Sequence, residues 1–160
     1  MNFDDQSMEM KRTLLEASVG GVSISAHLLE TNLKIILFSC LGLPDEKFDK
    51  EWSRPRTLGR IIEELKSYQL FSKSEMGEID SAKDARNSFT HCLSEFFSES
   101  IKSIGSMLEL IHRFDSIKSQ LDKSNSIVSQ KLHQQATLGG VDVNGIQNMA
   151  RNAVDSWENA

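Results

Sequence analysis

The chain has 160 residues, of which 39% are hydrophobic and 26% are charged, and its formal net charge is −5. These values are typical of a globular protein of one domain and exclude a protein whose whole surface binds nucleic acid, so any contact with a polyanion must be local. Because the sequence has neither an apolar run of about 18 residues nor a basic, apolar leader, we expect a soluble, cytoplasmic protein without a membrane partner.

The predicted secondary structure is helical throughout, because apolar residues recur at spacings of three and four and no long alternation with period two occurs. The first predicted helix runs from Val22 to Leu41 and ends at the glycine and proline that follow it. The segment from Met8 to Val19 is also helix-like. Gly20 and Gly21 separate the two segments, and the sequence leaves open whether they make a kink or a break.

Further helices are predicted after the two prolines. Thr57 is the expected N-cap of a helix whose apolar face is Leu58, Ile61, Ile62, Leu65 and Tyr68. Ser74 is expected to cap the next helix. A last long stripe consists of Ile101, Ile104, Leu108, Ile111, Phe114, Ile117 and Leu121. Together these segments predict an all-α fold, an up-and-down bundle of four to five helices.

The chain divides by composition into a predicted bundle, residues 1–124, and a polar C-terminal extension, residues 125–160. The extension is rich in Ser, Gln, Asn and Gly, and we expect it to be partly helical and then loosely held. Within it, Asn144 to Trp157 has apolar residues at helical spacing. This segment is expected to form a short amphipathic helix that docks on the bundle or on a partner protein.

The stretch KDARNSFTH concentrates polar groups in an otherwise apolar pattern. At about 100° per residue, Asn87 and His91 are about 40° apart on a helix, whereas Arg86 and His91 are about 140° apart. One interpretation is structural: Arg86 pairs with Asp84 or Glu95, and His91 is a hydrogen-bonded residue at the edge of the core. The other interpretation is a functional site.

Arg86, the polar Asn87 and, four residues later, His91 resemble the signature of the HEPN superfamily. In that family an arginine, usually followed by a polar residue, precedes a histidine by four to six positions. Its members are small α-helical bundles, commonly dimeric, and many are metal-independent endoribonucleases of toxin–antitoxin, phage-defence and RNA-processing systems. Others have lost the activity and serve as interaction modules. The resemblance covers roughly Val22 to Leu121.

The resemblance implies a site that needs no metal and no cofactor. His91, with an ordinary pKa of about 6.5, would be the acid or the base. Arg86 would hold two phosphate oxygens, and Asn87, one turn before the histidine, would orient it or the phosphate. Since one protomer supplies only one such histidine, a symmetric homodimer would set two copies of the motif across one cleft.

A candidate RNA-binding segment is WSRPRTLGR, which contains Arg54, Arg56 and Arg60 without an acidic residue. The alternative is a solvated loop whose arginines pair with nearby carboxylates. The acidic residues available for such pairs are Glu46, Asp49, Glu51, Glu63 and Glu64. Trp52 either stacks on a base or plugs the end of the bundle, and we favour the second.

The remaining reactive residues predict neither a metal site nor a disulfide framework. Cys40 and Cys92 have no CxxC or Cys/His spacing around them, and no HExxH, EF-hand, P-loop or GxGxxG motif occurs. His27 and His112 lie within apolar stripes and are expected to be boundary residues, and His133 lies in the polar extension.

Two functions follow from the sequence. The first is a HEPN-like metal-independent endoribonuclease, a dimer with a composite site that cleaves an RNA substrate and needs a neutralising antitoxin or another protein partner. The second is a catalytically inactive helical adaptor or regulator of the same fold. The acidic composition favours the adaptor, whereas the intact Arg, Asn and His favour the ribonuclease.

Overall fold

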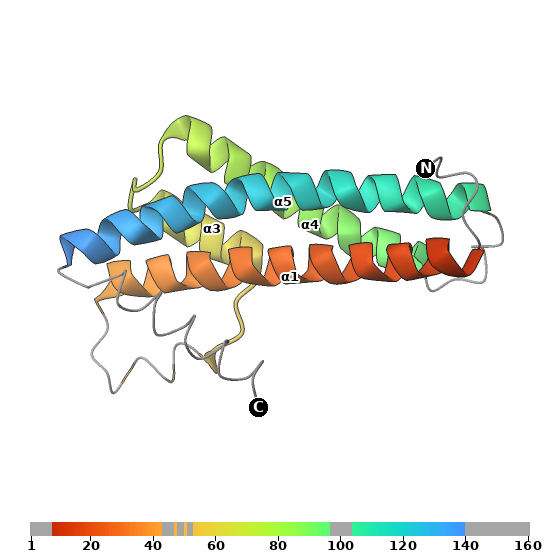
Figure 1. The fold of residues 1–160 in the computed structure, drawn as a ribbon. Coiled ribbons are helices and arrows are strands. Elements are labelled where there is room, and N and C mark those ends of the chain that lie inside the picture. Colours follow the sequence, from red (N-terminus) through yellow and green to blue (C-terminus); the bar gives the residue numbers. More distant parts are fainter. Residues whose placement is uncertain (1–7, 43–46, 48–49, 51–52, 97–103, 140–160) are drawn as a thin grey trace, which may run out of the picture.

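The predicted all-α fold is confirmed (Figure 1). The structure is a computed structural model that describes residues 8–42, 47, 50, 53–96 and 104–139 of the chain. Its helices are α1 (Met8–Leu41), α3 (Leu58–Lys66), α4 (Lys73–Phe96) and α5 (Ile104–Leu138). Within these ranges no β-strand occurs.

The two longest helices, α1 and α5, lie side by side and run in the same direction, while α4 crosses them in the opposite direction (Figure 1). Hydrogen bonds fix the pairing of α1 with α5, since Ser25 Oγ donates to Asp122 Oδ1 at 2.6 Å and Asn125 Nδ2 donates to the Ser25 carbonyl at 2.8 Å. The short helix α3 packs against both α1 and α4.

The core lies between α1, α4 and α5 and is closed at one end by α3. Its members share helical spacing on each element, as an amphipathic pattern requires. Fully buried apolar side chains from all four helices are Val22, Leu29, Leu33, Ile36, Leu37, Ile61, Ile62, Leu65, Ile79, Phe114, Leu121 and Val128. Burial of this apolar surface is the main contribution that holds the bundle together.

Helix α1 is continuous through Gly20 and Gly21, so these residues do not break it. The glycines differ in their surroundings. A Cβ at Gly21 would stand 3.3 Å from Cε of Lys118 on α5, whereas a Cβ at Gly20 would meet no atom within 4 Å. The absence of a side chain at Gly21 therefore leaves room for the Lys118 side chain, and Leu15 and Val22, both buried, anchor the helix before and after the pair.

The predicted start of α3 is confirmed. The side chain of Thr57 accepts a hydrogen bond from the backbone N–H of Arg60 at 3.3 Å, as an N-cap does. The predicted apolar face is buried except for its last member. Tyr68 lies beyond the end of the helix and is 38% exposed, because the chain turns there and Gln69 takes a positive φ of 52°.

The cap of α4 is Ser72 and not the predicted Ser74. The Ser72 N–H donates to Oε2 of Glu75 at 2.7 Å, and the Glu75 N–H donates back to Oγ of Ser72 at 3.2 Å. This reciprocal pair is a capping box, in which the third helical residue must be Glu or Gln. Of the two serines, Ser72 has a glutamate three positions later and Ser74 has a glycine, so the sequence itself contained the signal.

Helix α5 runs through residue 124 without interruption to Leu138. Val128 is fully buried in the core, and Ile127 and Leu132 pack against it. The predicted boundary between residues 124 and 125 therefore falls inside one helix, whose later turns belong to the bundle. The predicted helix Asn144–Trp157 lies outside the described residues.

One helix, Glu9–Leu41, is long and apolar enough to cross a membrane by length and composition alone. The core helix of a soluble bundle meets the same criterion. In this structure one side of the helix packs along α5, where Leu29, Leu33 and Ile36 are fully buried.

Candidate functional site

The α4 segment that carries the predicted signature is an amphipathic helix with a buried and a solvated side. Phe89 and Cys92 are almost fully buried and Leu93 is half-buried, as the apolar pattern predicts. Asn87 and His91 are exposed, on the side of α4 that faces solvent. Both therefore lie at the surface of one protomer, where a second molecule can reach them.

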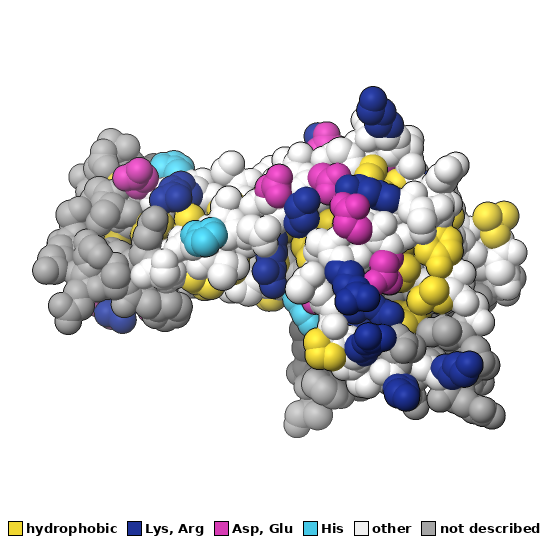
Figure 2. Space-filling model, turned by 180° about the vertical axis from the view of Figure 1, so that it is seen from behind, with side chains coloured by type: hydrophobic (Ala, Val, Ile, Leu, Met, Phe, Trp, Pro, Cys, Tyr) yellow, Lys and Arg dark blue, Asp and Glu magenta, His cyan; other side chains and the backbone are white. Residues whose placement is uncertain are grey.

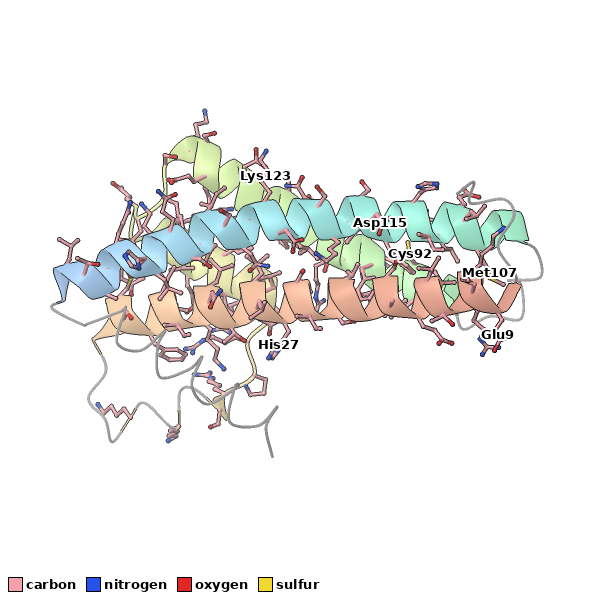
Figure 3. All side chains as sticks on the ribbon, in the orientation of Figure 1. Glu9, His27, Cys92, Met107, Asp115 and Lys123 are labelled. Carbon is pink, nitrogen blue, oxygen red and sulfur yellow. The ribbon has the colours of Figure 1, made fainter. Side chains whose placement is uncertain are left out.

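Arg86 is half-buried and lines a hollow of about 250 Å³ between α1 and α4. The other residues around this hollow are Ser23, Ala26, His27 and Glu30 of α1 with Phe89 and Thr90 of α4. In Figure 3 the side chain of His27 projects from the side of α1 that faces away from α5. We call this space the Arg86 hollow.

The guanidinium of Arg86 forms no hydrogen bond or ion pair with any side chain that the structure describes. The predicted pair with Asp84 does not form; the nearest cation to Asp84 is instead Lys83, whose Nζ lies 3.8 Å from Oδ1. The side chain of the alternative partner, Glu95, is not among those that the structure describes. A half-buried cation without a pair among the described groups is favourably placed to bind an anion.

The structure does not bring Arg86 and His91 together within one protomer. His91 is absent from the residues that line the Arg86 hollow, in agreement with the wide angle that helical geometry predicts between them. The histidine that does line the Arg86 hollow is His27, which we expected to be a boundary residue of the core. A signal was present, because Ser23, His27 and Glu30 recur at spacings of four and three on one face of α1.

The apolar residue Phe89 is buried beside the hollow. Phe89 packs edge-to-face on Phe114, with the ring centroids 5.5 Å apart and the planes at 76°. The two hydroxyls at the rim donate to helix carbonyls, Ser23 to Val19 at 2.9 Å and Thr90 to Arg86 at 3.3 Å. Their oxygens therefore remain as hydrogen-bond acceptors, and the donors of the hollow are Arg86 and His27.

The candidate RNA-binding arginines have different surroundings. The side chain of Arg56 is only 9% exposed; its Nε lies 3.7 Å from Oε2 of Glu64, and its guanidinium stands 5.1 Å from the ring centroid of Phe38. Arg60 Nε donates to Oε1 of the same glutamate at 3.0 Å. The alternative of pairing with carboxylates therefore describes these two residues. Arg54 is exposed.

Basic side chains on the face seen from behind do not form a continuous groove. Figure 2 shows lysines and arginines over the wider end of the molecule, interspersed with acidic side chains. Several lysines among the described residues form ion pairs. Lys66 lies 2.7 Å from Glu63 and 3.2 Å from Asp80, and Lys83 lies 3.3 Å from Asp80. Such paired charges screen one another and offer little to a polyanion.

The two cysteines and the other potential metal ligands among the described residues do not form a second candidate centre. Burial raises the pKa of the Cys40 thiol, against a smaller opposing effect of a hydrogen bond with Gln135, so this sulfur is a poor nucleophile at neutral pH. Cys92 is a free, buried thiol. Over residues 8–42, 53–96 and 104–139, no three His, Cys, Asp or Glu side chains cluster as metal ligands would.

Comparison with known proteins gives no relative. No family model matches the chain, and no curated protein or solved structure is significantly similar to it. The assignment of a function therefore depends on the residues themselves and on the geometry of the Arg86 hollow.

Proposed function

We propose that this protein is a HEPN-like, metal-independent endoribonuclease in which Arg86 binds the scissile phosphate, and that it acts as a homodimer of the toxin or phage-defence type. The observation that carries the proposal is the state of Arg86. It is half-buried beside an open hollow and forms no ion pair with a described residue. A structural arginine in that position would be expected to pair with a carboxylate.

The reaction needs three groups. A base takes the proton of the ribose 2′-OH, the 2′-oxygen attacks phosphorus, and an acid protonates the departing 5′-oxygen, while a cation stabilises the charge on the phosphorane. Arg86 is the cation in this proposal. The exposed His91 of each protomer, oriented by Asn87 one turn before it, supplies proton transfer when two α4 surfaces face each other across a dimer axis.

The experiment is cleavage of a panel of RNAs by the purified protein in excess EDTA. We compare the wild type with Asn87→Ala and His91→Ala and use His112→Ala, another exposed histidine, as the matched control. Loss of His91 should slow cleavage at least about 100-fold, in line with general acid–base catalysis. Light scattering of each variant tests the dimer. A monomeric protein with full activity contradicts the composite site.

A second candidate function is supported by the apolar surface of α1. Ile24 is 64% exposed, Leu28 is 48% exposed and Ile35 is 37% exposed, at spacings of four and seven along one face. Ile35 also borders an apolar hollow of about 530 Å³ between the C-terminal ends of α1 and α5. An exposed apolar face of this kind is typical of protein–protein contacts and favours an adaptor.

The two candidates predict different effects of the same substitution. Leu28→Asp places a charge on the α1 face at a position that does not itself line the Arg86 hollow. For an adaptor, this variant should abolish binding of the protein partner, and Arg86→Ala should not. For a ribonuclease, expression should slow growth in the wild type and not in Arg86→Ala.

A further inference from the structure

The Arg86 hollow combines three kinds of group that no element of the chain supplies alone. Helix α1 contributes His27 and, three residues later, Glu30, and α4 contributes Arg86. Residues three apart on a helix lie on the same face, so the imidazole and the carboxylate of α1 point toward the same side. A cation, a histidine and a carboxylate thus border one space of about 250 Å³.

These three groups do not neutralise one another. Arg86 and Glu30 are both half-buried and line the same hollow, yet no ion pair joins them, and no hydrogen bond involves the ring of His27, in the part of the chain that the structure describes. Partial burial of opposite charges normally brings them into contact. Their separation leaves room for a ligand that the cation and the carboxylate contact at different atoms.

The charges define the chemistry of that ligand. The fork of a guanidinium matches two oxygens of a phosphate, and a protonated histidine donates to a third oxygen. Glu30 would repel a phosphate and accept a hydrogen bond from a neutral hydroxyl. The hollow therefore fits a phosphate group with a hydroxyl next to it, as in a ribonucleotide.

We infer that the Arg86 hollow binds a ribonucleotide phosphate, that His27 contacts this phosphate together with Arg86, and that Glu30 contacts the adjacent 2′-OH. The catalytic part of this inference rests on the proposed ribonuclease function; the binding part does not. In cleavage, Glu30 takes the 2′-OH proton as the 2′-oxygen bonds to phosphorus. His91 of the second protomer gives its proton to the 5′-oxygen as that P–O bond breaks, leaving a 2′,3′-cyclic phosphate and a 5′-OH, while His27 stays on the phosphate beside Arg86.

Binding is tested by NMR of the full chain with ¹⁵N-labelled histidine. The four histidines are His27, His91, His112 and His133. Inorganic phosphate and a nucleoside 3′-monophosphate are titrated separately, at constant pH and ionic strength. We expect saturable shifts of the His27 ring with both ligands, tighter binding of the nucleotide, and affinity at least about tenfold lower in Arg86→Ala. His112→Ala, the matched control, should bind as the wild type does.

Either of two binding results overturns the inference: no saturable shift of His27 with the nucleotide, or equal shifts in wild type and Arg86→Ala. Shifts with inorganic phosphate that are as tight as those with the nucleotide overturn the ribonucleotide assignment. Circular dichroism of each variant checks that the helices are retained. Because His27 is exposed and alanine favours helices, His27→Ala should fold as the wild type does.

Cleavage distinguishes this inference from the function on which it rests. Glu30→Gln, which removes the base, and His27→Ala, which removes a donor to the phosphate, should each slow RNA cleavage at least about 100-fold. Full cleavage by both variants, with loss in His91→Ala, overturns the inference and leaves the ribonuclease intact. Nucleotide binding at His27 with no cleavage of any RNA supports the binding site and contradicts the ribonuclease.

Discussion

Arg86 of α4 and His27 of α1 line one hollow, although the whole of α3 lies between them in the sequence. His91, which the sequence motif associates with Arg86, is instead exposed on the outer side of α4. A phosphate bound to Arg86 would thus meet the histidine of its own protomer at His27 and would meet His91 only from a second molecule.

Arg56 should contribute to stability and not to RNA affinity. Its guanidinium lies over Phe38 and beside Glu64, and its side chain is 9% exposed. We expect Arg56→Ala to lower the free energy of unfolding by about 1–2 kcal/mol, because cation–π, ionic and packing contacts are lost together. Arg60→Ala, whose parent side chain is 62% exposed, is the control and should change it by less than about 0.5 kcal/mol. Urea denaturation measures both. Equal effects would mean that the Arg56 contacts do not form.

The two glycines of α1 should respond differently to alanine. A Cβ at position 20 meets no atom within 4 Å, so Gly20→Ala should stabilise the protein by about 0.5–1 kcal/mol through helix propensity. At position 21 the added methyl stands 3.3 Å from the Lys118 side chain, which must shift, and the gain should be smaller. Thermal unfolding compares the pair. Destabilisation by Gly20→Ala would show that α1 is not a continuous helix there.

Asp122 should make the α1–α5 contact sensitive to acid. Partial burial acts to raise the pKa of its carboxyl, but the Lys118 ammonium and the Ser25 hydroxyl outweigh that effect, so the pKa is lowered on folding. A lowered folded pKa gives stability that is present above the unfolded value of about 3.9 and is lost as the pH falls through the folded value.

Replacement of Asp122 by Asn tests that linkage. Because the side chain is 47% exposed, solvent screening limits the expected loss to about 1 kcal/mol or less at pH 7. The difference in unfolding free energy between wild type and Asp122→Asn should shrink between about pH 5 and pH 2. A difference that stays constant with pH would contradict the proposed role of the ionised carboxylate. Asp115→Asn, at an exposed position of the same helix, is the control.

Local patterns predicted much of the fold, since helix periodicity and capping depend on neighbours in sequence. The cap at Thr57 and the buried stripe that begins at Leu58 follow directly from the sequence. The continuity of α1 through Gly20 and Gly21 did not follow, because glycine propensity favours a break, and tertiary packing against α5 outweighs it. The same packing explains why the polar turns after residue 124 remain in α5, where Val128 is buried.

The candidate site was less predictable, because it depends on how two helices approach each other. The angle of about 140° between Arg86 and His91 on a helix correctly predicted that the two side chains do not meet on α4. It could not show that α1 would place His27 and Glu30 beside Arg86, since nothing in either segment specifies the register between helices distant in sequence. Likewise, the contact of Arg56 with Phe38 needed the packing of α3 on α1, whereas its pairing with Glu64 was among the alternatives that the sequence offered.

The most direct test of the central claim is the rate of RNA cleavage in excess EDTA by wild-type protein and by Arg86→Ala at equal concentration. Arg113→Ala, at an exposed arginine of α5, is the matched control. We predict cleavage by the wild type and the control that survives the chelator and falls by about 100- to 1,000-fold in Arg86→Ala, as removal of one group that stabilises a developing charge would do. Cleavage that EDTA abolishes, or that Arg86→Ala retains in full, would contradict a metal-independent site at Arg86.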